Sequence, residues 1–206
     1  MKSKRSSEIN ATEKILLSAR KEFAEHGLAG ARVDRIASRA GVNKAMIYYY
    51  FRSKENLYQT VISQQLSKVR ILAEEIVTTE VNPDSLLLRL AELYNSLFEN
   101  QEDLVPILLR EVASGGERIR RTLKQIITGK RLGKKVKEII GQGRKRGLFR
   151  DVDTKQAIIS FMGMNMFYLI MAPIVNSVWE IKDGKKFREK RPREVVDLFL
   201  HGLKKR

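Results

Sequence analysis

Asn43, Lys44, Tyr48 and Tyr49 are close in the sequence and carry side chains that hydrogen-bond to nucleic acids. Lysine donates to the acceptors of guanine, and tyrosine hydroxyls donate to phosphate oxygens. Aromatic residues occupy all four positions of 48–51, and one helix face cannot bury all of them, so we expect one or two to face solvent. The chemistry that this segment predicts is contact with DNA bases and phosphates.

Two short helices are expected to position these side chains, one over residues 33–40 and one over residues 44–51. Gly41 lies between them and permits the positive φ of a tight turn. The second helix is expected to start behind Asn43 as its N-cap. This order of elements predicts a helix-turn-helix, whose second helix enters a major groove. Its inner faces are expected to be formed by Ile36, Ala37, Val42 and Ile47.

This part of the chain resembles the TetR family of bacterial transcriptional regulators. The resemblance implies a dimeric repressor or activator, with an N-terminal DNA-binding domain and a divergent helical C-terminal domain that holds a small ligand. It rests on Ile15, Leu16, Ala19, Phe23, Gly27, Ile36, Ala37, Gly41, Val42, Ile47, Tyr48, Phe51, Ser53, Lys54, Glu55 and Leu57.

The resemblance also implies which residues contact DNA. Tyr50 holds a position that is often histidine in the family, and Lys54 holds that of a phosphate-contacting lysine. The family usually has threonine or serine where Ala31 and Arg32 stand, so we expect Arg32 to replace a phosphate contact and the helix cap to come from elsewhere. The recognition helix is expected to offer DNA the side chains of Asn43, Lys44, Ala45, Met46, Tyr48 and Tyr49.

The charge of the chain favours the same partner. Lys and Arg outnumber Asp and Glu by 40 to 24, which gives a net charge of +16. Residues 1–60 carry +6, residues 61–113 carry −5 and residues 114–150 carry +11. A basic balance of this size favours a polyanionic partner. The second basic block, residues 118–150, leaves three interpretations open: a solvated helix face, a further DNA-contacting surface, or an entrance for an anionic ligand such as an acyl thioester.

Every clear hydrophobic period in the chain is helical, so we expect an all-α protein. Residues 1–56 are expected to form a three-helix DNA-binding domain, and residues 57–206 a helical domain for ligand binding and dimerisation. Beyond the helix-turn-helix, helices are expected at 84–99, 102–114, 117–127, 130–146, 154–172 and 193–203.

Several helix ends carry recognisable signals. The first helix is expected to begin behind Asn10, which has a capping-box layout with Glu13, and to end at Gly27. Ser53 is expected to cap the fourth helix, and Asp153 the helix that begins at residue 154.

Residues 157–179 contain no charged side chain, and the stretch is long enough to span a bilayer. Asn165, Pro173 and Asn176 interrupt it, which favours burial in protein over insertion in a membrane. A helix that is apolar all round needs burial on every side, and a second subunit supplies this most easily. We therefore expect a homodimer whose interface includes Ile159, Gly163, Met166, Ile170, Val195 and Phe199.

A site for a small-molecule effector is expected in the C-terminal domain, because apolar pockets with a few convergent polar groups are the usual ligand sites of helical bundles. We expect a largely apolar effector, and an anionic group on it is an open alternative. Plain core packing is the alternative role for each candidate residue. The candidates are Tyr94, Phe98, Leu108, Arg110, Phe161, Asn165 and Tyr168.

The sequence offers little for catalysis. It has no cysteine and two histidines, so thiolate metal sites and histidine-based triads lack their residues. We expect no enzyme activity, no metal, no cofactor and no membrane partner. Because the sequence has no secretory signal, we expect the protein to act in the cytoplasm.

The expected function is a ligand-responsive regulator that binds a palindromic operator as a dimer and is released by its effector. We expect it to act as a repressor rather than as an activator. The alternative is a nucleoid-type protein that binds DNA without sequence preference and without an effector.

Overall fold

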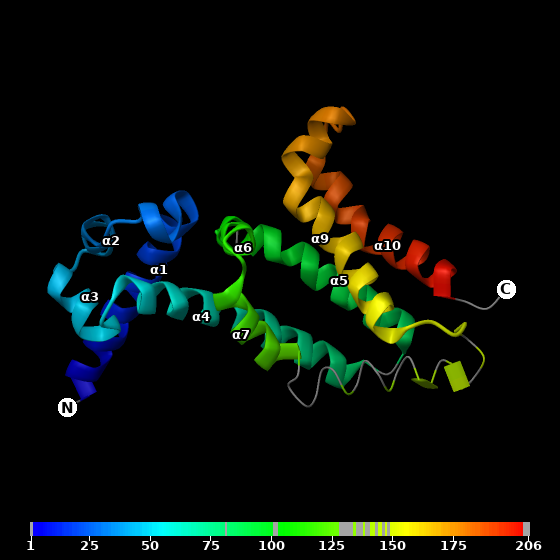
Figure 1. The fold of residues 1–206 in the computed structure, drawn as a ribbon, viewed down its shortest axis with the longest axis horizontal. Helices are drawn as coiled ribbons and strands as arrows, with labels where there is room; N and C mark the ends of the chain where they lie inside the picture. The colour runs from blue at the N-terminus through cyan, green and yellow to red at the C-terminus, as the bar shows by residue number, and fades with distance from the viewer. Residues whose placement is uncertain are drawn as a thin grey trace. The chain divides into compact units, whose positions relative to one another are not determined.

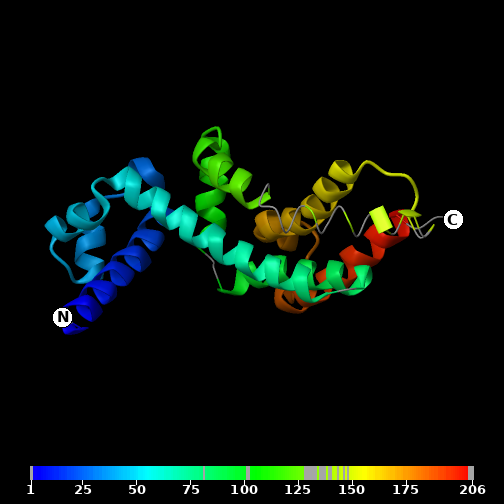
Figure 2. The same cartoon turned by 90° about the horizontal axis from the view of Figure 1, so that it is seen from below.

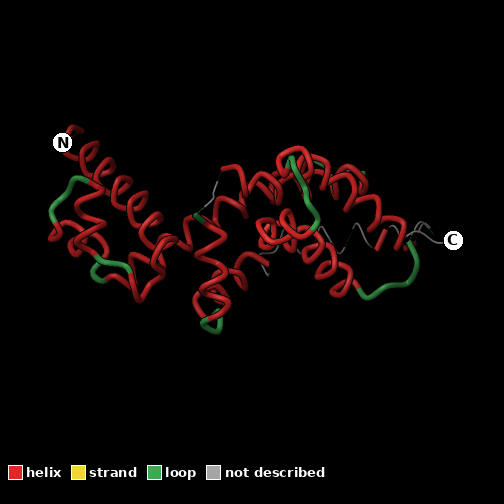
Figure 3. The backbone as a smooth tube through the Cα atoms, turned by 90° about the horizontal axis from the view of Figure 1, so that it is seen from above, coloured by secondary structure: helices red, strands yellow, loops and turns green. Residues whose placement is uncertain are grey.

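The structure is a computed structural model that describes residues 2–80, 82–100, 103–127 and 149–203, with residues 134, 138, 141, 142, 144, 145 and 147. Every element with defined bounds in this part of the chain is an α-helix, which confirms the all-α prediction (Figure 3). The helix expected at 130–146 lies almost entirely outside the described residues.

The chain divides into two compact units. The first unit combines Met1–Lys68 with Gln101–Leu123, and the second combines Val69–Asn100 with Lys124–Arg206. The domain boundary expected at residue 56 falls inside a helix and stays a prediction.

The first unit contains the predicted helix-turn-helix. Helices α1 (Lys2–Gly30), α2 (Val33–Ala40) and α3 (Lys44–Phe51) precede α4 (Lys54–Thr79), which begins in this unit (Figure 1). Helix α6 (Leu104–Ala113) and the part of α7 (Glu117–Ile127) up to Leu123 complete the unit, and α6 packs against α1. The core is apolar and includes Ile15, Phe23, Ile36, Ile47, Leu57 and Tyr58, each at most 1% exposed.

The second unit is built from α5 (Pro83–Asn100), α9 (Thr154–Val178) and α10 (Gly184–Leu203) (Figures 1 and 2). Both α9 and α10 contact α5, and α9 contacts α10. Their shared core includes Ala91, Phe149, Ala157, Phe161, Val195, Val196 and Leu200. Within the described residues, α9 is the one helix whose length and composition would let it cross a membrane, and 28% of its most apolar window is buried.

The capping signals of the sequence had mixed outcomes. Asn43, Ser53 and Asp153 each accept a hydrogen bond from a backbone N–H in the first turn of their helices, which confirms them as N-caps. The start expected behind Asn10 is wrong, because α1 begins at Lys2 and runs through Asn10. Polar residues on the exposed face of a long helix produce the same spacing as a capping box. Gly27 interrupts α1 with φ 64°, and helix resumes as far as Gly30.

Two further helix boundaries were predicted wrongly: the end expected at residue 172 and the start expected at residue 193. Helix α9 continues through Pro173 to Val178, and α10 begins at Gly184 and contains Pro192. A proline inside a helix removes one backbone hydrogen bond without preventing the turns on either side from forming.

Candidate functional site

The turn between α2 and α3 has the geometry expected of a helix-turn-helix. Gly41 has φ 66° and ends α2, and the N–H of Val42 donates to the carbonyl of Ala37 at 3.0 Å. The side-chain oxygen of Asn43 then accepts a hydrogen bond from the N–H of Ala45 at 2.9 Å, which starts α3. The turn is therefore fixed by local backbone and side-chain chemistry.

Helix α3 buries one face and leaves the other to solvent. Ile47 and Phe51 are its buried residues, whereas Tyr48 and Tyr49 are 42% and 71% exposed. This confirms the expectation that some of the consecutive aromatic residues face outward. Asn43, Lys44 and Ala45 are exposed, and Met46 and Tyr50 are half-buried. The predicted DNA-contacting residues of α3 therefore lie at or beside its solvent-facing side.

Lys44 does not stand free on this surface. Its Nζ lies 2.9 Å from Oδ1 of Asp34 on α2, and this hydrogen-bonded pairing raises the pKa of the lysine. Both side chains are largely exposed, so the pair contributes little to stability. Asp34 therefore orients the lysine at small cost, and it is a competitor of DNA in the contact predicted for Lys44.

Lys54 combines two roles. Its Nζ donates to the carbonyls of Ala31 at 3.2 Å and Ala29 at 3.4 Å, so it satisfies backbone groups at the end of α1. An ammonium group has three donors, and one remains for an anion. The N-terminus of α4, which Ser53 caps, lies at the same place and also favours a phosphate.

Glu22 supplies the cap that the sequence lacks at α2, and sequence reasoning missed this residue. The Arg32 side chain makes no cap, but Oε1 of Glu22 accepts hydrogen bonds from the N–H of Arg32 at 3.0 Å and from Nε of Arg35 at 2.7 Å. Glu22 is fully buried, and burial alone would raise its pKa, but the hydrogen bonds from Arg35 and Arg32 outweigh burial and lower it. The sequence did contain a signal for this role: Glu22 lies seven residues after Ile15, about two helical turns, and so falls on the buried stripe of α1.

The predicted effector residues are divided between the units. Tyr94, Asn165 and Tyr168 line one hollow of the second unit, which Asn95 and Arg191 also line. Sequence reasoning missed these last two residues. Phe161 is instead 6% exposed in the core, with its ring 5.1 Å from that of Phe199.

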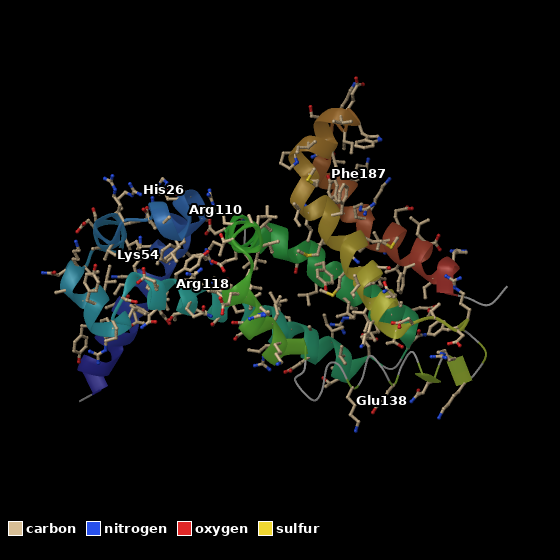
Figure 4. The ribbon with its side chains drawn as sticks, in the orientation of Figure 1. His26, Lys54, Arg110, Arg118, Glu138 and Phe187 are labelled. Carbon is tan, nitrogen blue, oxygen red and sulfur yellow. The ribbon has the colours of Figure 1, made fainter. Side chains whose placement is uncertain are left out.

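The other effector candidates lie elsewhere. Leu108 and Arg110 belong to α6 in the first unit. Arg110 donates to the carbonyl of Glu25 at 3.1 Å, at the end of the long part of α1 where His26 also lies (Figure 4). The side chain of Phe98 lies outside the described residues.

The residues predicted for a dimer interface differ in their exposure. Ile159 is 63% exposed and Gly163 is exposed, while Met166, Ile170 and Phe199 are half-buried. Val195 is 1% exposed in the core of its own subunit, so it offers no surface to a partner. Large apolar side chains that the prediction omitted are about as exposed as Ile159: Phe167 59%, Ile174 56%, Val178 65% and Leu198 62%.

Two short helices that each bury one face, the glycine turn between them, and a lysine and tyrosines on the solvent-facing side of the second helix define the class of helix-turn-helix DNA-binding proteins. A family model described as "Bacterial regulatory proteins, tetR family" matches residues 15–61, and one described as "Tetracyclin repressor-like, C-terminal domain" matches residues 83–198. The chain belongs to the TetR family of bacterial regulatory proteins.

Known relatives agree with this assignment. The transcriptional repressor NicS of Pseudomonas putida is 29% identical over 196 residues, which cover 94% of this chain and 92% of that protein. The putative regulator SCO4942 of Streptomyces coelicolor has the same fold, with a TM-score of 0.69, 25% identity and coverage of 93% and 97% of the two chains. The regulator FadR of Bacillus subtilis, in complex with stearoyl-CoA, shares the fold at 20% identity, with a TM-score of 0.71 and coverage of 92% and 98%. The chain is a DNA-binding transcriptional regulator of this family.

Proposed function

We propose that this regulator is a repressor that binds a palindromic operator as a homodimer, with α3 of each protomer in a major groove, and that a small effector releases it. The observation that carries the DNA-binding part is α3 itself, which buries Ile47 and Phe51 and leaves Asn43, Lys44 and Tyr49 exposed. Two such helices related by a two-fold axis read half-sites about one helical turn apart or slightly more.

The residues of this surface divide by role. Lys44 reaches guanine acceptors and Met46 contacts a thymine methyl group, with Asn43, Ala45 and Tyr48 beside them. The phosphate contacts, which fix the position of α3 in the groove, come from Arg32, Tyr49, Tyr50 and Lys54.

Exposed apolar surface on α9 and α10 supports the homodimer. Ile159, Phe167, Ile174 and Val178 are each more than half exposed and recur along α9 at intervals close to whole helical turns, and Leu198 adds to the surface from α10. Apolar surface of this extent marks an interaction site. No atom lies within 4 Å of the position that a Cβ would take at Gly163, so this site permits close approach of a second helix. In this proposal Val195 supports the contact from inside the subunit.

The hollow of the second unit is the proposed effector site. The complex of Bacillus subtilis FadR with stearoyl-CoA supports the general idea, because a protein of the same fold there holds a small molecule. An effector releases DNA when it binds the DNA-free state more tightly than the DNA-bound state. The proposed place of action is the cytoplasm, and no membrane partner is part of the proposal.

Nuclease footprinting with the full-length protein on DNA beside its own gene tests the proposal, because regulators of this kind often control a neighbouring gene. We expect two protected half-sites related by two-fold symmetry. Uniform protection that follows protein concentration along the whole fragment would instead indicate the nucleoid-type alternative.

A further inference from the structure

Asp34 and Lys44 form an ion pair between the two helices of the helix-turn-helix. Asp34 lies in the first turn of α2, and Lys44 is the first residue of α3. The Nζ of Lys44 lies 2.9 Å from Oδ1 and 3.0 Å from Oδ2 of Asp34, so both carboxylate oxygens are close to the ammonium group. The side chain of Asp34 is 72% exposed and that of Lys44 is 47% exposed, so the pair lies on the surface that is proposed to meet DNA.

Asp34 differs from the other charged residues of α2 in the helix that it contacts. Arg35 and Arg39 donate to carboxylates of α1. Asp34 instead pairs with Lys44 of α3, which is the one cation within 4 Å of it among the described residues. The carboxylate of Asp34 therefore belongs to the surface that carries Lys44, and the contacts between α2 and α1 do not depend on it.

A phosphate and a guanine edge are affected differently by this pair. A phosphate that approaches Lys44 also approaches Asp34, and two anions beside one cation repel each other. A guanine edge offers acceptors without a net charge, so it accepts hydrogen bonds from Lys44 without this repulsion. An ammonium group has three donors, and the hydrogen bond to Asp34 leaves two of them for a base. Asp34 therefore weakens a contact of Lys44 with phosphate more than a contact with guanine.

We propose that Asp34 is a specificity-determining residue, which weakens binding to DNA of any sequence and so favours the use of Lys44 on the bases of the operator. Non-specific binding depends on phosphate contacts, so a residue that disfavours one such contact raises the ratio of operator affinity to random-DNA affinity. This role rests on the proposed function, in which Lys44 reaches guanine acceptors.

Two other roles of Asp34 predict different results. A surface ion pair without a role in recognition predicts that loss of the carboxylate changes the affinity for operator and random DNA by the same factor. Direct recognition of a cytosine amino group by Asp34 predicts that operator affinity falls when the carboxylate is lost.

The test is fluorescence anisotropy of the full-length protein at about 0.1 M salt with two duplexes. The selected duplex is one that the protein enriches from a random library, and the shuffled duplex has the same bases in another order. Asp34→Asn is expected to raise the affinity for the shuffled duplex about tenfold and that for the selected duplex by at most about threefold. The slope of log affinity against log salt on the shuffled duplex is expected to steepen by about one, because Lys44 gains a phosphate contact.

Three further variants test the cause of this change. Asp34→Ala is expected to act as Asp34→Asn does, because both remove the charge. Glu55→Gln removes a negative charge from an exposed position at the start of α4, and it is expected to change both affinities by the same factor because phosphates are present in both duplexes. In a Lys44→Ala background, Asp34→Asn is expected to leave the ratio of the two affinities unchanged within about twofold. Circular dichroism reports whether each variant is folded.

Three results would overturn the role of Asp34: an unchanged ratio in Asp34→Asn, a ratio that still falls in the Lys44→Ala background, or a loss of operator affinity in Asp34→Ala. Lys44→Ala alone separates these results from failure of the proposed function. If Lys44→Ala weakens binding to the selected duplex only, while Asp34→Asn keeps the ratio, the role of Asp34 is refuted and base reading by Lys44 stands. If Lys44→Ala weakens binding to both duplexes equally, base reading by Lys44 is refuted, and the role of Asp34 with it.

Discussion

The buried carboxylate of Glu22 lies 2.6 Å from the guanidinium of Arg35, and the same oxygen accepts the backbone N–H of Arg32. One fully buried residue of α1 therefore holds the start of α2 and one of its side chains. Helix α2 contacts α3 and leads into it through the Gly41 turn. By holding the start of α2, Glu22 therefore also helps to position α3.

Glu22→Gln is expected to lower the free energy of unfolding by about 2 to 4 kcal/mol, because it removes the charge that pairs with Arg35 in a buried position. Chemical denaturation followed by circular dichroism measures this loss. Glu13→Gln changes an exposed carboxylate of the same helix and is expected to cost less than about 0.5 kcal/mol. Equal losses for the two variants would refute the role of Glu22.

The same carboxylate predicts a pH dependence. The pKa of Glu22 in the folded protein is below its ordinary value of 4.5, so its contribution is fully present above that value and is lost as the pH falls through the folded pKa. The stability difference between the natural protein and Glu22→Gln is expected to be constant from about pH 7 to pH 5 and to shrink below about pH 4.5. Thermal unfolding of both proteins across this range measures it, and a difference that does not shrink at all below about pH 4.5 would contradict the assignment.

If Lys44 reads a base edge as proposed, Lys44→Ala is expected to weaken operator binding by about 1 to 3 kcal/mol and to change binding to random DNA much less. Asp34→Asn removes the competitor for Lys44 and is expected to leave operator affinity unchanged or up to about threefold higher. Fluorescence anisotropy on both kinds of duplex measures these effects. An equal loss on operator and random DNA for Lys44→Ala would show that the lysine contacts phosphate.

Lys54→Met is expected to weaken binding to all DNA alike and to reduce the slope of log affinity against log salt by about one, because it removes the proposed phosphate contact. Anisotropy titrations at several salt concentrations give the slope. Lys21→Met removes an exposed charge from α1 and serves as the control, with an expected change in slope below about half. An unchanged slope for Lys54→Met would restrict Lys54 to its contacts with Ala29 and Ala31.

The parts predicted correctly from the sequence are those that depend on neighbouring residues. Gly41, Asn43 and Ser53 act on backbone groups within a few positions, so their roles follow from local chemistry. Asn10 and Pro173 are exceptions, because helix continues through Asn10, which was expected to start one, and through Pro173, near which one was expected to end.

The parts that were missed depend on partners far along the chain. Glu22 accepts hydrogen bonds from Arg32 and Arg35. Arg191 donates to the carbonyl of Met164 and lies over the ring of Tyr168. No spacing of neighbouring residues identifies such pairs. A charged residue on an apolar stripe was the sequence signal for Glu22. Arg191 lies in a strongly basic segment, where nothing in the sequence separates it from its exposed neighbours.

Phe167→Glu is expected to convert a homodimer into a single chain, because it places a charge on the exposed apolar face of α9. Light scattering after size exclusion is expected to give twice 23.7 kDa for the natural protein and about that mass for the variant. Val112→Glu makes the same change at an apolar residue of α6 that is 67% exposed, and it is expected to remain dimeric. A natural protein with the mass of one chain would refute the homodimer.

The central claim is that α3 reads a DNA sequence, and selection of bound duplexes from a random library by the full-length protein tests it most directly. The enriched sequences are expected to share an inverted repeat with half-sites about one helical turn apart or slightly more, and Lys44→Ala is expected to relax the preference at a guanine in each half. A library that remains random after repeated rounds, although the protein retains it, would contradict sequence recognition and indicate binding to phosphates alone.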